Sequence, residues 1–264
     1  MSLMDALSNA ITGTSAQSFA LNNISGNIAN STTAGFKSTD TSFADMLAQT
    51  EAGTQPAGGV AISTRSNLGL QGTVASTGIA TNLAIGGDGY FVVRQNLGTA
   101  SAPSFGSALA YTRRGDFAPD ASGYLVNGAG YYLFAGASTG APVQVPATAT
   151  SALSSLSVSP AGALTGTLSD GSTQALGTLA LAQFGARDTL ASLDGGAFVA
   201  TASTGAPSFG LNGATVTGGS VEQSNASISD QFSKMIETQQ AYSSNTKVIS
   251  TVNEMLQSAI AMYV

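Results

Sequence analysis

The chain has 264 residues, of which only 8% are charged; its formal net charge is −6, and it has neither cysteine nor histidine. Without cysteine and histidine, this sequence can form no thiolate or imidazole metal site, no cysteine nucleophile, no serine–histidine–aspartate triad and no disulfide. Eight lysines and arginines leave no basic footprint for nucleic acid, and no apolar run reaches the ~18 residues of a membrane span. We therefore expect no cofactor, no metal, no nucleic acid and no membrane insertion. The opening residues carry an early acid, Asp5, and no basic stretch, so we also expect no cleaved secretory signal.

Residues 3–29 have the pattern of an amphipathic helix. They contain no proline, and apolar side chains recur at a spacing of three and four residues. Small polar residues occupy the positions between them, so the apolar seam is weak. The apolar positions are Met4, Leu7, Ile11, Leu21 and Ile28.

A longer helix is predicted from Ile228 towards the end of the chain. Residues 220–264 contain neither glycine nor proline. Ser227 or Ser229 is a suitable N-cap. A helix of ~35 residues would be ~50 Å long, which is more than a typical globular helix needs. One apolar stripe comprises Ile228, Phe232, Met235, Tyr242, Ile249, Leu256, Ile260 and Tyr263. A second comprises Val248, Val252, Met255, Ala259 and Met262.

The two terminal helices lie at opposite ends of the chain, and we expect them to pair as a coiled coil formed by residues 1–30 and 220–264. One partner helix cannot cover the widened stripe of the C-terminal helix. Uncovered apolar surface of that size is typical of an interface.

The region between the helices divides into a link and a β-rich body. Residues 31–71 are polar and predict an extended linking segment, while 72–219 predict an all-β domain. Short apolar runs such as 83–85 and 90–93 alternate there with glycine-rich turns, and 169–172 reads as a hairpin turn joining 163–168 to 178–181. This pattern favours a sandwich or barrel-like arrangement. The fold class is therefore α+β.

No constellation of residues indicates catalysis. Asp88 lies in a glycine-rich turn, where a hairpin is the simpler interpretation than a calcium loop. The acid pairs Asp116 with Asp120 and Glu222 with Glu237 lack the aromatic flanks of a sugar cleft, and we expect solvated or capping carboxylates. Arg113 and Arg114 read as a surface basic pair beside Asp116. We expect a protein that is not an enzyme.

Four ordered blocks of sequence resemble flagellar rod and hook proteins. Residues 22–47 read NNISGNIANSTTAGFKSTDTSFADML, 83–93 read LAIGGDGYFVV, and 111–136 read YTRRGDFAPDASGYLVNGAGYYLFAG. Residues 219–256 resemble the final helix of that family. The motif positions are Asn27, Asn30, Gly35, Phe36, Lys37, Gly89 and Phe91.

The resemblance implies an axial subunit of the bacterial flagellum, exported by the flagellar type III apparatus without a cleaved signal. It implies a helical homopolymer at the periplasmic or extracellular hook or basal body. Its neighbours would be rod, hook-cap and hook–filament junction proteins. On that basis the predicted subunit-interface residues are Leu7, Ile11, Leu21, Ile28, Phe232, Met235, Tyr242, Ile249, Val252, Leu256 and Ile260.

The position along the flagellar axis has two interpretations. The segment 30–72 resembles hook proteins more closely and favours the hook, the universal joint that transmits torque to the filament. A length of 264 residues suits a distal rod subunit, which remains the alternative. Two other classes remain open: a secreted β-rich adhesin, which would not need two long terminal helices, and a carboxylate-based hydrolase.

Overall fold

The computed structural model describes residues 3–45, 59–99, 103–136, 140–145 and 153–262. The chain divides into two compact units. The helical unit comprises Met1–Ser31, Ser38–Asn67 and Ala226–Val264, and the β unit comprises Thr32–Lys37 and Leu68–Asn225. The chain therefore passes between the units four times, and each unit contains segments that are distant in sequence.

The helical unit contains α1 (Leu3–Ala29) and α2 (Ile228–Ala261), together with strands β1 (Thr39–Asp45) and β2 (Val60–Ser66). Both predicted helices are present. The hydroxyl of Ser227 caps α2 by accepting from the backbone N–H of Asp230 at 3.4 Å, as the sequence predicts.

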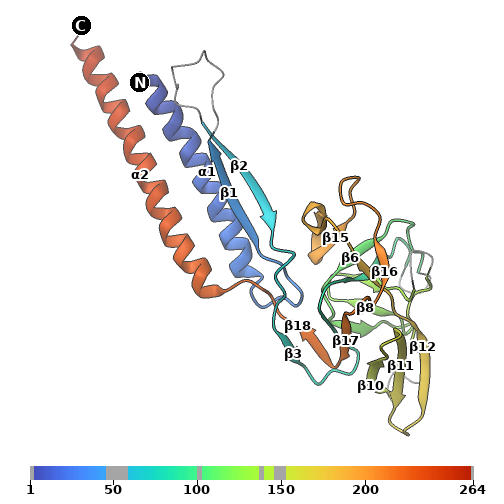
Figure 1. Ribbon diagram of the computed structural model, residues 1–264. Coiled ribbons are helices and arrows are strands. Elements are labelled where there is room, and N and C mark those ends of the chain that lie inside the picture. Colours follow the sequence, from blue (N-terminus) through green and yellow to red (C-terminus); the bar gives the residue numbers. More distant parts are fainter. Residues whose placement is uncertain (1–2, 46–58, 100–102, 137–139, 146–152, 263–264) are drawn as a thin grey trace. The chain divides into compact units, whose positions relative to one another are not determined.

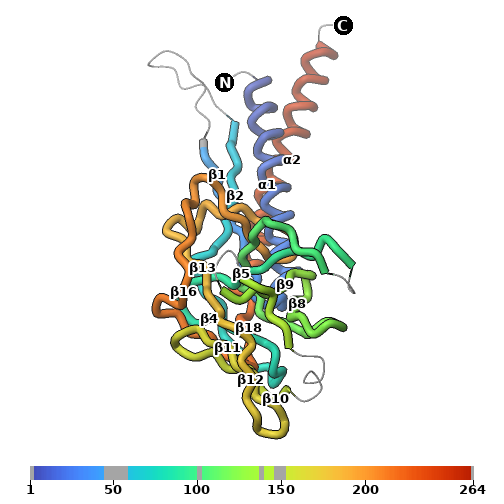
Figure 2. The backbone as a smooth tube through the Cα atoms, turned by 90° about the vertical axis from the view of Figure 1, so that its right-hand side faces the viewer, coloured from blue at the N-terminus to red at the C-terminus, as the bar shows by residue number. Residues whose placement is uncertain are grey.

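Helices α1 and α2 pack side by side and run in opposite directions, and the β1–β2 hairpin lies along α1 (Figure 1). Figure 2 shows the same pairing from a second side. The hairpin lies in the sequence that we expected to be an extended link, 31–71. Its register places Thr39 opposite Ser66 and Asp45 opposite Val60.

The β unit contains short antiparallel strands throughout. In chain order they are β3 (Val74–Ser76), β4 (Leu83–Gly86), β5 (Tyr90–Gln95), β6 (Ala110–Thr112), β7 (Phe117–Pro119), β8 (Leu125–Asn127), β9 (Tyr131–Leu133), β10 (Leu153–Val158), β11 (Ala163–Leu168), β12 (Thr173–Thr178), β13 (Leu181–Gln183), β14 (Ala191–Leu193), β15 (Ala197–Val199), β16 (Ser208–Gly210), β17 (Thr215–Gly218) and β18 (Ser220–Glu222). Short 3₁₀ turns η1 (Arg187–Thr189) and η2 (Asp194–Gly196) flank β14.

The largest sheet has the order β14-β15-β6-β5-β9-β8-β7, with β13 joining β5 to β16. Both faces of its central strand are covered. Phe91 and Val93 enter one apolar cluster, whereas Tyr90 and Val92 enter the other. This explains why the strand reads as an unbroken apolar run rather than an alternating one.

Several sequence expectations are corrected by the topology. In the described residues the large sheet is open, with β14 and β7 at its ends, so it does not close into a barrel. Strands β4 and β5 follow each other around the Asp88 turn but pair with different strands, so that turn is not a hairpin. The turn at 169–172 does join a hairpin, although its second strand begins at Thr173 rather than Thr178.

Candidate functional site

A fully buried carboxylate, Glu222, is the centre of the most distinctive polar feature of the β unit. One of its oxygens accepts from the Nζ of Lys37 at 2.6 Å and from the backbone N–H of Gly72 at 3.0 Å. The other accepts from the guanidinium of Arg113 at 3.2 Å. The three side chains are 0%, 1% and 4% exposed. We call Lys37, Arg113 and Glu222 the charge cluster.

The charge cluster joins the parts of the β unit that lie next to the chain crossings. Lys37 and Asn225 both donate to the carbonyl of Leu70, at 2.7 Å and 3.0 Å. The backbone N–H of Gly35 donates to the carbonyl of Glu222 at 2.7 Å, and that of Asn225 donates to Phe36 at 3.3 Å. Three segments, around residues 35–37, 70–72 and 222–225, are thus held to one another.

Close backbone approach explains the glycine in the first of these segments. Gly35 has φ +66°, and a Cβ there would lie 2.5 Å from the backbone nitrogen of Arg114. An L-residue would be strained by the dihedral and obstructed by the backbone of Arg113 and Arg114. The Gly-Phe-Lys motif therefore combines the tight approach at Gly35 with the buried cation at Lys37.

Two cations and one anion share this buried site. Burial lowers the pKa of Lys37 below its usual range, and the adjacent Glu222 carboxylate opposes that shift. The Arg113 guanidinium also donates to the carbonyl of Gly87 at 2.8 Å and lies 5.3 Å from the centre of the Tyr90 ring. A buried pair of this kind adds little net stability, but removing one partner is costly. The charge cluster therefore acts mainly by specifying which segments meet.

In the helical unit, an equally buried polar contact joins α1, β1 and α2. The amide of Asn27 donates to the carbonyl of Thr39 at 2.9 Å and accepts from the N–H of Thr39 at 2.9 Å. It also donates to the Oε1 of Gln231 at 3.0 Å. Asn27 is 2% exposed and Gln231 is 5% exposed. We call these three residues the amide knot.

The remaining seam between the helices uses small side chains. Ala10, Ala16 and Ala20 are the buried residues of α1 that precede Ile24, and a Cβ on Gly13 would lie 2.8 Å from the side chain of Asn245. The seam thus has little large apolar surface. The broad apolar stripe that the sequence predicts is only partly used between these two helices.

The large apolar residues of α2 instead lie on its two flanks. Ile228, Phe232 and Ile236 are 46%, 50% and 56% exposed, and their spacing places them along one strip. Val248 and Met255 are 42% and 53% exposed, and at ~100° per residue they lie on the other side of the seam. Exposed apolar side chains therefore lie on both sides of the seam, and Tyr242 and Ile260 lie on the same side as Phe232.

The predicted interface residues fall into three groups of exposure. Val252 is buried within the helical unit. Half-buried positions are Leu7, Leu21, Ile28, Met235, Ile249 and Leu256. Exposed positions are Ile11, Phe232, Tyr242 and Ile260. The exposed group is available to a partner, whereas Val252 is occupied by its own chain.

The other motif residues, Asn30, Gly89 and Phe91, lie at a helix end, next to strand β5 and in the core of the β unit. Asn30 donates from its side chain to the carbonyl of Gly26 at 2.9 Å, at the end of α1. Gly89 has φ +141° beside Leu181. Phe91 is fully buried and packs edge to face on Phe117, with ring centroids 5.5 Å apart.

The acidic and basic pairs are arranged differently from the sequence expectation. Arg114 does pair with Asp116 at 2.7 Å near the surface, but its neighbour Arg113 is buried. Glu222 is neither solvated nor capping, which corrects that expectation. Its partners are 185 and 109 residues away in sequence, and no local pattern identifies them. Glu237 belongs to the helical unit, so Glu222 and Glu237 form no pair within one unit.

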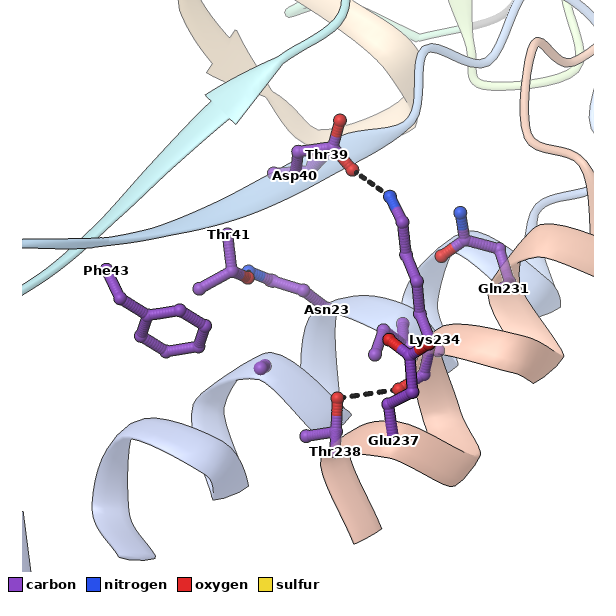
Figure 3. Close-up of a pocket in the computed structure, with 11 residues that line it drawn as sticks. Asn23, Thr39, Asp40, Thr41, Phe43, Gln231, Lys234, Glu237 and Thr238 are labelled. Atoms are coloured by element: carbon purple, nitrogen blue, oxygen red, sulfur yellow. Dashed lines mark hydrogen bonds and ion pairs between the residues drawn. The ribbon is translucent and has the colours of Figure 1, made fainter. Parts of the chain in front are cut away.

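A cavity of about 360 Å³ opens beside the seam of the helical unit. Figure 3 shows Lys234 of α2 reaching Asp40 of β1, with Phe43 on one side of this pair and Gln231 on the other. Lys234 pairs with Asp40 at 2.9 Å, and both side chains are about half exposed. The lining mixes polar and apolar groups.

A family model described as the flagellar hook protein FlgE/F/G D1 domain matches residues 84–166. Another, described as the flagellar basal body rod FlgEFG protein C-terminal, matches 217–262. Over 277 aligned residues the chain is 32% identical to the flagellar basal-body rod protein FlgG of Bacillus subtilis (strain 168), covering 98% of each chain. The chain belongs to the flagellar rod and hook protein family.

Other members of the family align in two ways. The rod protein FlgG of Caulobacter vibrioides is 32% identical over 96% of this chain and 97% of its own. The hook protein FlgE of Brucella abortus is 39% identical over 133 residues, which cover 50% of this chain and 31% of that protein. The resemblance found in the sequence is therefore confirmed at the level of the family. Among the described residues, no helix has the length and apolar character needed to cross a membrane.

Proposed function

We propose that this chain is an axial subunit of the bacterial flagellum that polymerises through its terminal helices into a helical tube. The observation that carries the proposal is the end-to-end match to rod proteins, over 98% of both chains. The apolar flanks of α2 supply the surface that a neighbouring copy would bury. Because the two flanks differ, contacts between copies would be heterologous, and a repeated heterologous contact that does not close gives a helical assembly.

Two positions along the axis are candidates. The rod is the better supported, since rod proteins match this chain over almost their whole length. The hook is the second candidate, because a hook protein shows the higher identity, 39%, over half of this chain. In either position the subunit would be exported by the type III apparatus and assembled outside the inner membrane, next to rod, hook-cap or junction proteins.

In this proposal the paired helices form a coiled coil whose outer surface is completed by other copies. In the β unit, the charge cluster connects the segments around residues 35–37, 70–72 and 222–225, which lie next to the points where the chain passes between the units. Torque transmitted along the chain from one unit to the other would pass through these connected segments. Isolated amphipathic helices gain most of their stability from packing. The helical unit is therefore expected to gain stability on assembly.

A clean deletion followed by electron microscopy of isolated basal bodies tests the proposal. A truncated rod supports the rod position, and a complete rod without a hook supports the hook. Intact rods, hooks and filaments in the deletion strain would contradict both.

A further inference from the structure

The packing of α1 against α2 keeps one antiparallel register over at least two heptads. Asn27 meets Gln231 at one end, and Gly13 meets Asn245 at the other. Residues 27 and 13 are fourteen apart in α1, and residues 231 and 245 are fourteen apart in α2. Ala20 and Thr238, the midpoints of these two intervals, both line the cavity beside the seam. The seam thus has successive layers, each pairing one residue of α1 with one of α2.

Most of these layers carry little information about register. Gly13 and Ala20 are small enough to lie opposite several kinds of side chain, and Thr238 and Asn245 need no large complementary hole. If α2 moved by one heptad, ~10.5 Å along its axis, Asn245 would lie opposite Ala20 and Val252 opposite Gly13. Because Gly13 and Ala20 carry almost no side chain, these two layers alone do not distinguish the two registers.

The Asn27 layer differs because its polar groups have defined partners. Thr39 offers both an N–H and a carbonyl to the Asn27 amide, so the orientation of that amide is fixed. Its nitrogen then requires an acceptor from α2, which Gln231 supplies at 3.0 Å. After a one-heptad shift, Thr238 would lie there instead, and its short hydroxyl-bearing side chain would replace the long amide. A buried polar group that loses its partner is costly.

We propose that the Asn27–Gln231 hydrogen bond specifies the register of the terminal helix pair. Asn27 and Gln231 are positioning residues: they select one height of α2 against α1, while the small-residue layers supply only contact. A single polar layer that fixes register at some cost in stability is a known device in paired helices. Here the amide knot also anchors the selected register to β1, because Thr39 holds the same amide.

Engineered disulfides in the full chain test this directly, because the natural sequence has no cysteine. The pair Gly13→Cys with Asn245→Cys reports the observed register, and Gly13→Cys with Val252→Cys reports the shifted one. A disulfide needs Cα atoms about 4.4–6.8 Å apart, so a ~10.5 Å shift separates the two reporters. With Asn27 and Gln231 intact, oxidation should cross-link only the first pair.

Replacing the acceptor should change this outcome. In the Gln231→Met background, the shifted pair should cross-link at least several-fold above its level in the parent. The control Gln240→Met, at an exposed site of the same helix, should leave it at the parent level. Exclusive cross-linking of the first pair in Gln231→Met would overturn the proposal.

A second variant keeps the test decisive if Gln231→Met weakens the helix pair. Adding Thr238→Gln to Gln231→Met moves the amide acceptor one heptad along α2. Helical circular dichroism close to that of the parent, together with dominant cross-linking of the shifted pair, is the expected result. Retained helicity with cross-linking only in the observed register would reject the proposal.

Discussion

Removing the carboxylate of Glu222 should destabilise the β unit strongly. Glu222→Met keeps most of the side-chain volume but leaves two buried cations, Lys37 and Arg113, without their shared anion. Removing one partner of a buried ion pair costs about 3–5 kcal/mol. Because a domain is typically stable by about 5–15 kcal/mol, this is a large fraction of the total.

The charge cluster also predicts how combined substitutions behave. The triple variant Lys37→Met, Arg113→Met and Glu222→Met removes both cations with the anion, so no uncompensated charge remains buried. Its cost should be well below that of Glu222→Met alone, because well-packed apolar replacements of a buried ion cluster are often nearly neutral. The strong non-additivity is the signature of residues that act as one network.

Urea unfolding of the full chain measures these effects. Five of the seven tyrosines lie in residues 68–225, so near-ultraviolet circular dichroism reports mainly on the β unit. Asp88→Asn is the matched control, since Asp88 pairs with Arg187 at 2.6 Å but is 72% exposed. That surface pair should contribute less than about 1 kcal/mol. If Glu222→Met costs no more than this control, or if the triple variant costs the sum of its parts, the reasoning is refuted.

Three further predictions concern single residues. Burial raises the pKa of Tyr90 to about 12, so the stability that the neutral phenol provides is complete below pH 10 and is lost as the pH rises through 12. In unfolding measured between pH 9 and 12, Tyr90→Phe should therefore remove about 2–3 kcal/mol of the alkaline loss of stability. An alkaline slope that is the same in Tyr90→Phe and in the parent would contradict this. A hydrogen bond from Asn67 lowers the pKa of Asp40, so the stability that the Asp40 carboxylate provides is present above pH 3.8 and is lost on acidification below it. Asp40→Asn should reduce the loss of unfolding free energy of the helical unit at acidic pH by less than about 1 kcal/mol. A larger loss at acidic pH in Asp40→Asn than in the parent would refute the assignment. In urea unfolding, Gly35→Ala should destabilise the β unit by more than about 2 kcal/mol. The control is Gly130→Ala, because Gly130 has φ +84° but open space around its Cβ position, and this substitution should cost only about 1 kcal/mol. Equal costs for the two substitutions would argue against the close approach at Gly35.

Local features of the fold were accessible from the sequence because their causes are local. Helix α2 has a hydroxyl cap at Ser227 and no internal glycine or proline, and both signals lie within the segment itself. The buried strand β5 is indicated by its unbroken apolar run, which directly follows Gly89. Such elements follow from propensity and periodicity.

Features that depend on distant partners were not accessible. Glu222 reads as an ordinary carboxylate, because neither Lys37 nor Arg113 is near it in the sequence. Periodicity also identified the apolar stripes of α2 without indicating which side of each faces α1. The structure assigns Gln231 and Val252 to that contact and leaves Phe232 exposed. A stripe that serves two kinds of partner cannot be divided by spacing alone.

The central claim is that the exposed flanks of α2 bind neighbouring copies in the flagellar axis. A deletion strain complemented with Val248→Ser and Met255→Ser tests it most directly, with Ser250→Ala, also exposed on α2, as the control. The account predicts that the double variant is exported and found unassembled, with no rod or hook beyond that of the deletion strain, while the control restores the complete structure. Complete, motile flagella built from the double variant would contradict the claim.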